Sequence, residues 1–252
     1  MTVTTADRGA ARVITWDRQA RRNAWDLDTM TAIADAVETA GADPAVRCVV
    51  LRGAGEHFSA GDDLQSALEA DSAAWAETIE GFQRMTRVVL AAPVPAIAAV
   101  DGVCVGGALE FAASCDLRLC TDRVRLLTPE VGIGLVASNA GTLLLPEVVG
   151  EGAARELLLG GQPRDAAWAR RHGFATEMVS PGELDGRIEH WAGVFAAGSR
   201  AAVAATKSML NERFGELLQA AMERETHHCV RLFDEDDART ALREFAERRA
   251  AR

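Results

Sequence analysis

The chain has 252 residues, of which 48% are hydrophobic and 25% charged, values typical of a globular protein with one sizeable core. Its formal net charge of −10 argues against a nucleic-acid surface, because phosphate binding needs a concentrated field of lysine and arginine. The first residues lack a basic and apolar signal segment, and no run approaches the roughly 20 uninterrupted apolar residues that span a bilayer, so we expect a cytoplasmic protein without membrane contact.

Short apolar runs in the first part of the chain predict buried strands. Five such runs, brief and rich in valine, isoleucine or leucine, lie at residues 12–16, 47–51, 96–100, 117–120 and 176–179. Helical patterns separate several of them. This alternation predicts an α/β core.

Two helices are predicted between the first three strands. In the first, apolar residues recur at helical spacing after Asp28, a suitable N-cap, and Gly41 is a suitable end. The second extends from residue 71 to 90 and ends before Pro93. It carries an apolar stripe formed by Trp75, Ile79, Phe82 and Met85. We interpret this stripe as core packing, and the alternative is a pocket for a substrate tail.

After residue 180 the strand pattern ends. Residues 184–195, 201–210, 217–232 and 238–250 are predicted to form successive helices. These helices carry more apolar side chains than an isolated appendage should expose, including Met209, Leu210 and Leu217. We therefore expect burial of this region against neighbouring copies of the chain.

Cysteine, histidine and glycine patterns give no sign of a metal or redox cofactor. The five cysteines form no CxxC pair and lie mostly in apolar runs, so we interpret them as reduced core residues. His227 and His228 are adjacent, would point to different faces of a helix and have no third ligand at a useful spacing. The glycines at 102, 106 and 107 do not form the G-x-G-x-x-G pattern of a dinucleotide site.

Two segments, residues 57–64 and 102–110, place small residues where the chain would leave a strand and enter a helix. Small residues leave backbone N–H groups accessible at such a place. Two N–H groups that converge on one point would stabilise a carbonyl oxygen as it becomes an enolate or a tetrahedral anion, and each lowers the barrier by typically about 3–4 kcal/mol. The sequence therefore predicts an oxyanion site.

Two glutamates lie near these glycines. Glu110 follows Gly107 by three residues, so one helical turn presents a free N–H and a carboxylate together. Glu130 interrupts an apolar passage from strand to loop, where desolvation should raise its pKa towards the range useful for proton transfer. The alternatives are an acid favoured by the helix dipole for Glu110 and a loop-side salt bridge for Glu130. The pairing with the glycines favours acid–base catalysis.

Residues 58–64, with the sequence FSAGDDL, resemble the F-x-A-G-x-D-L signature of the enoyl-CoA hydratase/isomerase, or crotonase, superfamily. Residues 101–118 are similar to the family's D-G-x-x-x-G-G-G-x-E and C-D run. Further similarity extends over residues 22–24, 129–131, 141–142, 205–208 and 233–248. The resemblance thus covers essentially the whole chain.

The resemblance implies an α/β fold of the crotonase type, with a spiral of ββα units in residues 1–180. A helical region in residues 181–252 would then cover the active site and form a homotrimer or a dimer of trimers. The implied partner is an acyl-CoA thioester, with no cofactor beyond the coenzyme A of the substrate and no nucleic acid. By motif position, the resemblance assigns catalytic roles to the N–H groups of Ala60 and Gly107, which would bind the thioester oxygen. It assigns further catalytic roles to Glu110 and Glu130. The same resemblance implies substrate contacts from Arg22, Ala24, Ala60, Asp62, Leu64, Gly106, Gly107 and Ser138.

Possession of both glutamates is the pattern of a hydratase, which adds water to 2-trans-enoyl-CoA to form 3-hydroxyacyl-CoA. One carboxylate would activate water for attack at C3, and the other would deliver a proton to C2. Because two close carboxyl groups titrate as a pair, which glutamate performs which step stays open. The alternative activities are Δ3-Δ2 enoyl-CoA isomerisation or another CoA-enolate reaction, such as decarboxylation, that depends mainly on Glu130. A non-catalytic protein that binds CoA esters or RNA is the third hypothesis.

The sequence departs from the family pattern at a few positions. Ala108 replaces the third glycine of G-G-G, and we expect its methyl group to face the packing side. Ala137 replaces a frequent proline, and Ser138 with Asn139 places polar groups in a loop that is usually rich in glycine. Trp25 replaces a leucine, and we interpret it as a core residue.

Overall fold

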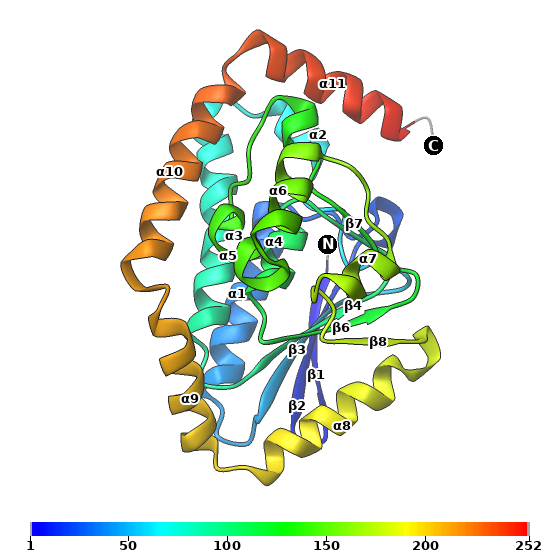
Figure 1. Cartoon of the computed structure of the whole chain (residues 1–252), viewed down its shortest axis with the longest axis vertical. Coiled ribbons are helices and arrows are strands. Elements are labelled where there is room, and N and C mark those ends of the chain that lie inside the picture. Colours follow the sequence, from blue (N-terminus) through cyan, green and yellow to red (C-terminus); the bar gives the residue numbers. More distant parts are fainter. Residues whose placement is uncertain (1, 251–252) are drawn as a thin grey trace.

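A six-stranded sheet occupies the lower half of the molecule in Figure 1. The computed structural model, which describes residues 2–250, orders its strands β1-β2-β3-β4-β6-β8. β1 is antiparallel to β2, and all other neighbours are parallel. The predicted α/β class is confirmed. The strands are β1 (Thr2–Arg8), β2 (Ala11–Asp17), β3 (Cys48–Gly53), β4 (Ala96–Val100), β6 (Leu117–Thr121) and β8 (Glu177–Val179).

A second, smaller sheet pairs β5 (Val103–Val105) with β7 (Arg125–Leu127) in parallel. A bridge between Ser59 and Cys104 extends this pairing to the segment after β3. The chain therefore passes three times from the large sheet to the small one, after β3, β4 and β6. Because the parallel strands follow each other in chain order without reversal, the passes stack as turns of a spiral. Equivalent positions of the three turns consequently meet at one edge.

Helices follow these passes. They include α2 (Leu64–Glu69), α3 (Ser72–Ala91), α4 (Gly107–Ser114) and α5 (Gly141–Val149), and α1 (Leu27–Ala42) lies along α3. The predicted N-cap of α1 is wrong. Asp26 has the extended backbone of an N-cap and accepts a hydrogen bond from Thr29 N–H, whereas Asp28 lies within the first turn. Gly41 lies inside the helix, which ends one residue later.

Aromatic rings fill the core between the sheet and these helices. The ring of Trp25 makes edge-on contacts with those of Trp16 and Phe111, at centroid distances of 5.3 and 5.5 Å. The interpretation of Trp25 as a core residue is confirmed, since it is fully buried. Ala108 is also fully buried in this cluster, and all five cysteines are buried and free of disulfides.

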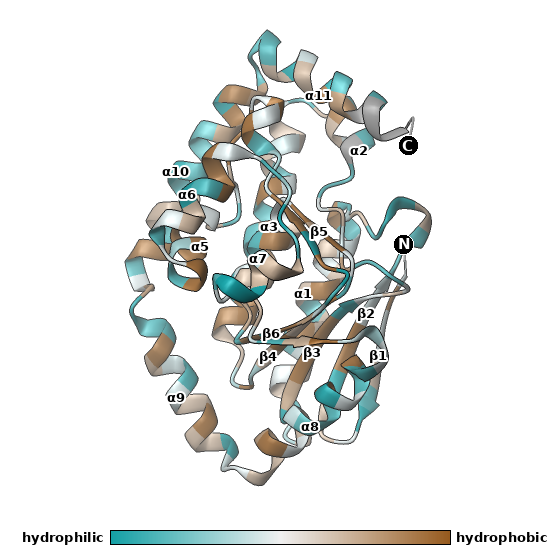
Figure 2. Ribbon diagram, turned by 45° about the vertical axis from the view of Figure 1, so that its right-hand side comes forward, coloured by the Kyte–Doolittle hydropathy of each residue, from teal (hydrophilic) through white to brown (hydrophobic). Residues whose placement is uncertain are grey.

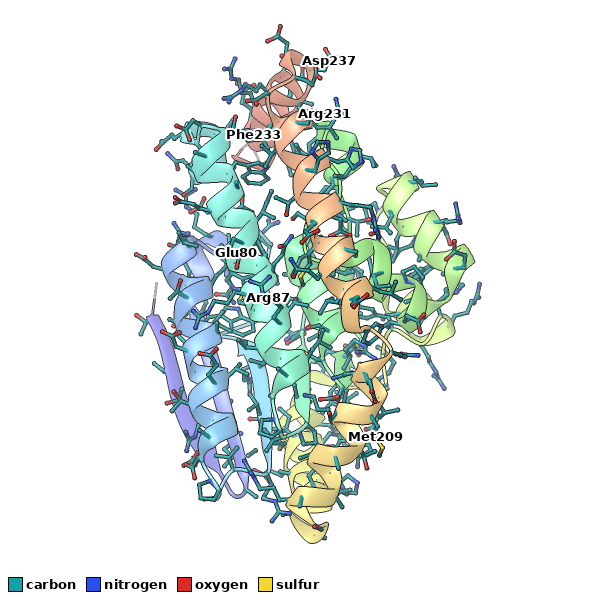
Figure 3. The ribbon with its side chains drawn as sticks, turned by 90° about the vertical axis from the view of Figure 1, so that its left-hand side faces the viewer. Glu80, Arg87, Met209, Arg231, Phe233 and Asp237 are labelled. Carbon is teal, nitrogen blue, oxygen red and sulfur yellow. The ribbon has the colours of Figure 1, made fainter. Side chains whose placement is uncertain are left out.

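The helical tail predicted after residue 180 is confirmed, and it packs on the helices near the site. α10 lies along α3 and α5 (Figure 3), and α11 covers α2 and a 3₁₀ turn at Glu130–Ile133. The rings of Trp75 and Phe233 stack 4.9 Å apart between α3 and α10. The remaining helices are α6 (Glu151–Gly160), α7 (Ala166–Arg171), α8 (Leu184–Ala197), α9 (Arg200–Glu212), α10 (Gly215–Phe233) and α11 (Asp236–Ala250).

α9 and the start of α10 expose large apolar side chains. Met209, Leu210 and Leu217 are 65%, 64% and 59% exposed. Figure 3 shows Met209 on the outer side of α9, and hydrophobic residues recur along this helix in Figure 2. The apolar surface expected in the tail is thus present.

Candidate active site

A cavity lies where the three turns of the spiral meet α3, α10 and α11. Its empty space, counted out to the mouth and including open solvent, is about 590 Å³. Asp62 and Glu130 contribute carboxyl groups to a wall that is otherwise mainly apolar. The apolar side chains include Ala67, Trp75, Phe82, Ile133, Leu135 and Leu242. The interpretation of the α3 stripe as core packing is confirmed, and its residues Trp75 and Phe82 also line the cavity.

Gly106 and Gly107 bring the start of α4 to the cavity. As the first residue of the helix, Gly107 has an N–H without an acceptor inside α4, and the helix dipole adds partial positive charge there. A Cβ at Gly107 would lie 2.5 Å from the ring of Phe82, and a Cβ at Gly106, where φ is +59°, would lie 2.7 Å from Glu130 Oε1. Packing thus requires both glycines, and the N–H of Gly107 stays without an acceptor in α4.

The second predicted donor is already engaged. Ala60 lines the cavity, but its N–H donates to the carbonyl oxygen of Arg22 at 2.9 Å. Arg22 and Asn23 both have left-handed backbones, with φ of 51° and 58°. The Asn23 side chain fixes this turn by donating to the carbonyl oxygens of Ala54 and His57. In this conformation, Ala60 N–H is not available to a ligand.

Glu110 is fully buried on α4. Its Oε2 accepts hydrogen bonds from the N–H groups of Asn139 and Gly141, at 2.9 and 3.0 Å, whereas Oε1 is buried without a partner. A Cβ at Gly141 would lie 2.4 Å from Glu110 Oε2, which explains the glycine at that position. Burial, followed by the negative charges of Glu225 and Glu130, raises the pKa of Glu110 well above its ordinary value. These surroundings favour the protonated form of Glu110.

Glu130 begins the 3₁₀ turn that follows β7, the third turn of the spiral. Its Oε2 is buried without a partner, and the residue lines the cavity. Burial raises the pKa of Glu130 to about 7, and the charge of Glu225 acts in the same direction. The proposed salt bridge at this position is not found among the described residues. The predicted desolvation is found instead.

Glu225 was not predicted from the sequence, where it is one acid on a charged helix. It lies on α10, is 4% exposed, and accepts from Ala140 N–H at 2.6 Å and from Thr142 N–H at 2.8 Å. The hydroxyl of Thr142 donates to the same carboxylate at 2.5 Å. Burial raises the pKa of Glu225, and these three hydrogen bonds oppose the effect. The available signal was the helical spacing of the apolar residues around position 225, which puts this glutamate on the apolar face of the helix. Charged residues are seldom buried without partners.

The other predicted substrate contacts have different surroundings. Asp62 lines the cavity, with Oδ2 buried and unpartnered, and burial raises its pKa to about 7. Ser138 also lines the cavity, while Ala24 is buried and the side chain of Arg22 is exposed. The side chain of Leu64 lies outside the part of the chain that the structure describes.

None of the helices in residues 2–250 combines the length and the hydrophobicity needed to cross a bilayer. Within the same residues, histidine, cysteine and acidic side chains do not gather into a cluster that could hold a metal ion. The pair His227 and His228 has its rings 5.3 Å apart on the charged helix α10.

Comparison with known proteins gives the same family across nearly the whole chain. The family model described as enoyl-CoA hydratase/isomerase matches residues 7–252. A crotonyl-CoA hydratase of Syntrophomonas wolfei is 32% identical over 93% of this chain and 91% of its own length. A short-chain-enoyl-CoA hydratase of Clostridium acetobutylicum is 31% identical over 96% of this chain and 93% of its own length.

Solved structures have the same fold. The crystal structure of an enoyl-CoA hydratase from Mycobacterium avium subsp. paratuberculosis K-10 matches with a TM-score of 0.88 and 26% sequence identity. The match covers 98% of this chain and 96% of that one. The spiral, the small sheet and the C-terminal helices described above are therefore those of a known architecture.

Proposed function

The chain belongs to the enoyl-CoA hydratase/isomerase family, and from this premise we propose that it adds water to 2-trans-enoyl-CoA to form 3-hydroxyacyl-CoA. The relatives named as enoyl-CoA hydratases, which align over more than nine tenths of this chain, support the proposal. They do not define the acyl group.

One observation carries the proposal. Glu110 and Glu130 are both buried, and each has a carboxyl oxygen without a partner. Their pKa values are raised, so a proton can be shared between them near neutral pH. The free N–H of Gly107 begins the helix that carries Glu110. We assign the oxyanion donor to Gly107 N–H and the acid and the base to the two glutamates, because water addition to an enoyl thioester requires these three functions.

In the proposed reaction, the thioester carbonyl oxygen binds the N–H of Gly107, and its developing negative charge meets the positive end of α4. One glutamate removes a proton from water as the oxygen attacks C3, and the other delivers a proton to C2. The acyl chain lies along the apolar wall near Trp75 and Leu242, where it loses contact with water.

Separate replacement of the two glutamates tests the proposal. We expect Glu110→Gln and Glu130→Gln each to lower kcat by about 10²-fold or more, the range typical of removing a general acid or base. The hydration rate is measured as the decrease in the absorbance of the enoyl thioester. Glu223→Gln is the control, since it removes an exposed carboxylate that bonds Gln219 on α10. Turnover that persists unchanged in both active-site variants would exclude the assignment.

A second activity is favoured by one specific observation. Glu130 lines the cavity, whereas Glu110 is turned towards residues 139 and 141 and is not part of the described cavity wall. A single base at Glu130 would suffice for Δ3-Δ2 isomerisation or another CoA-enolate reaction. Assay of Glu110→Gln with a 3-enoyl-CoA separates the two activities: isomerisation would survive this substitution, and hydration would not.

A further inference from the structure

Four consecutive backbone N–H groups, those of residues 139–142, donate alternately to two carboxylates. Residues 139 and 141 donate to Glu110 Oε2, at 2.9 and 3.0 Å, and residues 140 and 142 donate to Glu225, at 2.6 and 2.8 Å. The left-handed backbone of Ala140, with φ of 58°, lies in the middle of the segment. Both carboxylates are therefore bound to the same short stretch of backbone, one from α4 and one from α10.

This arrangement makes the position of Glu110 dependent on Glu225. The N–H groups that hold Glu110 Oε2 belong to a segment whose other two N–H groups are held by α10. Gln83 fixes the preceding residue, because its side-chain amide donates to the carbonyl of Ser138 at 2.8 Å. Without the bonds to Glu225, the segment would lose its restraint on the side opposite to Glu110, and the left-handed turn at Ala140 would lose its support. The Glu110 carboxylate would then have no fixed direction.

The hydrogen bonds also indicate where negative charge resides. Both oxygens of Glu225 accept hydrogen bonds, whereas Glu110 and Glu130 each have an unpartnered oxygen. Donors to a carboxylate stabilise its charged form, so Glu225 is the member of the three that best retains the charge. A fixed charge there raises the proton affinity of both other glutamates.

Few other charged groups act on Glu225. On α10 itself, Arg224 is exposed and favours the charged form. On α3, Arg87 contacts Met222 of α10 and is paired with Glu80, close to the helix in Figure 3. From α5, Glu147 is paired with Arg213, and from α11, Arg239 lies over the ring of Phe233. The titrating groups that couple to Glu225 are thus Glu110 and Glu130.

We propose that Glu225 is a positioning residue for the hydration reaction: its carboxylate holds residues 139–142 against Glu110 and places a negative charge close to the Glu110 carboxyl. This inference rests on the function proposed above. Hydration needs one glutamate protonated and the other charged, and negative charge on a third carboxylate nearby opposes loss of the proton. Through Glu225, a helix of the C-terminal tail thus takes part in setting the active site.

Two variants separate the two parts of the proposal. Glu225→Gln keeps the size of the side chain and removes the charge. Its amide NH2 group, itself a donor, would face the N–H donors of residues 139–142. We expect a fall in kcat of about 10-fold to 100-fold, as for a misplaced catalytic group. Because the charge that raises the pKa of Glu110 and Glu130 is absent, both limbs of the profile of kcat against pH move to lower pH. KM changes far less than kcat, since Glu225 does not contact the substrate.

Glu225→Asp keeps the charge and shortens the reach by one methylene group. We expect a comparable fall in kcat with both pH limbs in their wild-type positions. Glu223→Gln, on the same helix but exposed, serves as the matched control and leaves both kcat and the pH limbs unchanged. Circular dichroism and thermal unfolding establish that each variant is folded. If Glu225→Gln does not fold, the loss of kcat in Glu225→Asp remains the test of positioning.

The outcomes distinguish this proposal from the proposed function. A wild-type chain that turns over no enoyl thioester overturns the hydratase assignment, and this proposal with it. If the wild-type chain is active and its pH profile coincides with that of Glu225→Gln, the role assigned to the charge is overturned. The positioning role is not affected by this outcome. Wild-type kcat in Glu225→Asp overturns the positioning role. Reduced kcat in both variants, with displaced limbs only in Glu225→Gln, supports the proposal in full.

Discussion

At the scale of single residues, the carboxyl of Asp62 carries a cost in folding stability. Its Oδ2 is buried without a partner, and burial raises its pKa to about 7, above the ordinary value of 3.8. The fold therefore disfavours the charged form. The penalty is absent below about pH 4, grows as pH rises towards 7 and is constant above it. This sign is opposite to that of a salt-bridged aspartate.

We expect Asp62→Asn to raise the free energy of unfolding by about 1–3 kcal/mol at pH 8, since one pKa unit corresponds to about 1.4 kcal/mol. The gain should vanish near pH 4. Chemical unfolding at the two pH values measures both quantities. Asp122→Asn, at an exposed position, is the control. Equal gains for Asp62→Asn at both pH values would contradict a charged-state penalty.

Gly141 gives a steric test of the Glu110 geometry. A Cβ there would lie 2.4 Å from Glu110 Oε2, a distance that no relaxed structure allows, so Gly141→Ala must displace the carboxylate. We expect kcat to fall by about 10²-fold, because a displacement near 1 Å can have this effect. Gly152→Ala is the control, since its Cβ would meet open space within α6, where alanine favours the helix by about 0.5–1 kcal/mol. Turnover of Gly141→Ala at the wild-type rate would refute this account of Glu110.

The two glutamates proposed as catalytic and the nearby glycines could be predicted from the sequence because their spacing along one helix or one motif is local. Glu225 could not, since its partners lie more than eighty positions earlier in the chain and only tertiary packing brings α10 to them. The engagement of Ala60 N–H by Arg22 was missed for a similar reason. It depends on two left-handed residues without glycine, which sequence rules do not anticipate.

At the scale of elements, prediction succeeded where burial on both faces gives a continuous apolar run. β4 was predicted with its observed bounds, and β2, β3, β6 and β8 within two residues. β1 was missed because nearly all of its residues are exposed at the edge of the sheet and show no apolar alternation. β5 and β7 have three residues each, too few to show a period.

The cap of α1 offers a paired test at this scale. The side chain of Asp26 accepts from both the N–H and the hydroxyl of Thr29, whereas Asp28 is exposed within the first turn. We expect Asp26→Ala to lower the free energy of unfolding by about 1 kcal/mol, the usual effect of removing an N-cap. Asp28→Ala should lower it by no more than about 0.5 kcal/mol, the dipole effect of one exposed acid. Denaturant unfolding of the two variants measures which substitution lowers the free energy of unfolding more. A larger loss for Asp28→Ala would restore Asp28 as the N-cap.

At the scale of the whole molecule, the C-terminal helices have one face committed to the site and another left open. α10 reaches the active-site segment through Glu225, and α9 is anchored by Lys207, which is 5% exposed, donates to the carbonyls of Val89 and Val94, and pairs with Asp116 at 2.8 Å. With that side of α9 fixed, Met209 faces outward (Figure 3). The division at residue 180 remains a prediction, as does the oligomer.

We predict that this outer apolar face joins copies of the chain into the expected homotrimer or dimer of trimers. Met209, Leu210 and Leu217 are each more than half exposed, and burial of such side chains against a neighbour contributes about 1.5–3 kcal/mol apiece. Light scattering at micromolar concentration should give the mass of three or six chains. The double variant Met209→Glu with Leu217→Glu should dissociate, whereas Leu159→Glu, which is equally exposed but lies on α6, should not. A monomeric wild type would exclude the oligomer, and a double variant of unchanged mass would place the interface on another face. Because α10 links this face to Glu225, dissociation should also lower kcat, which the same preparations can report.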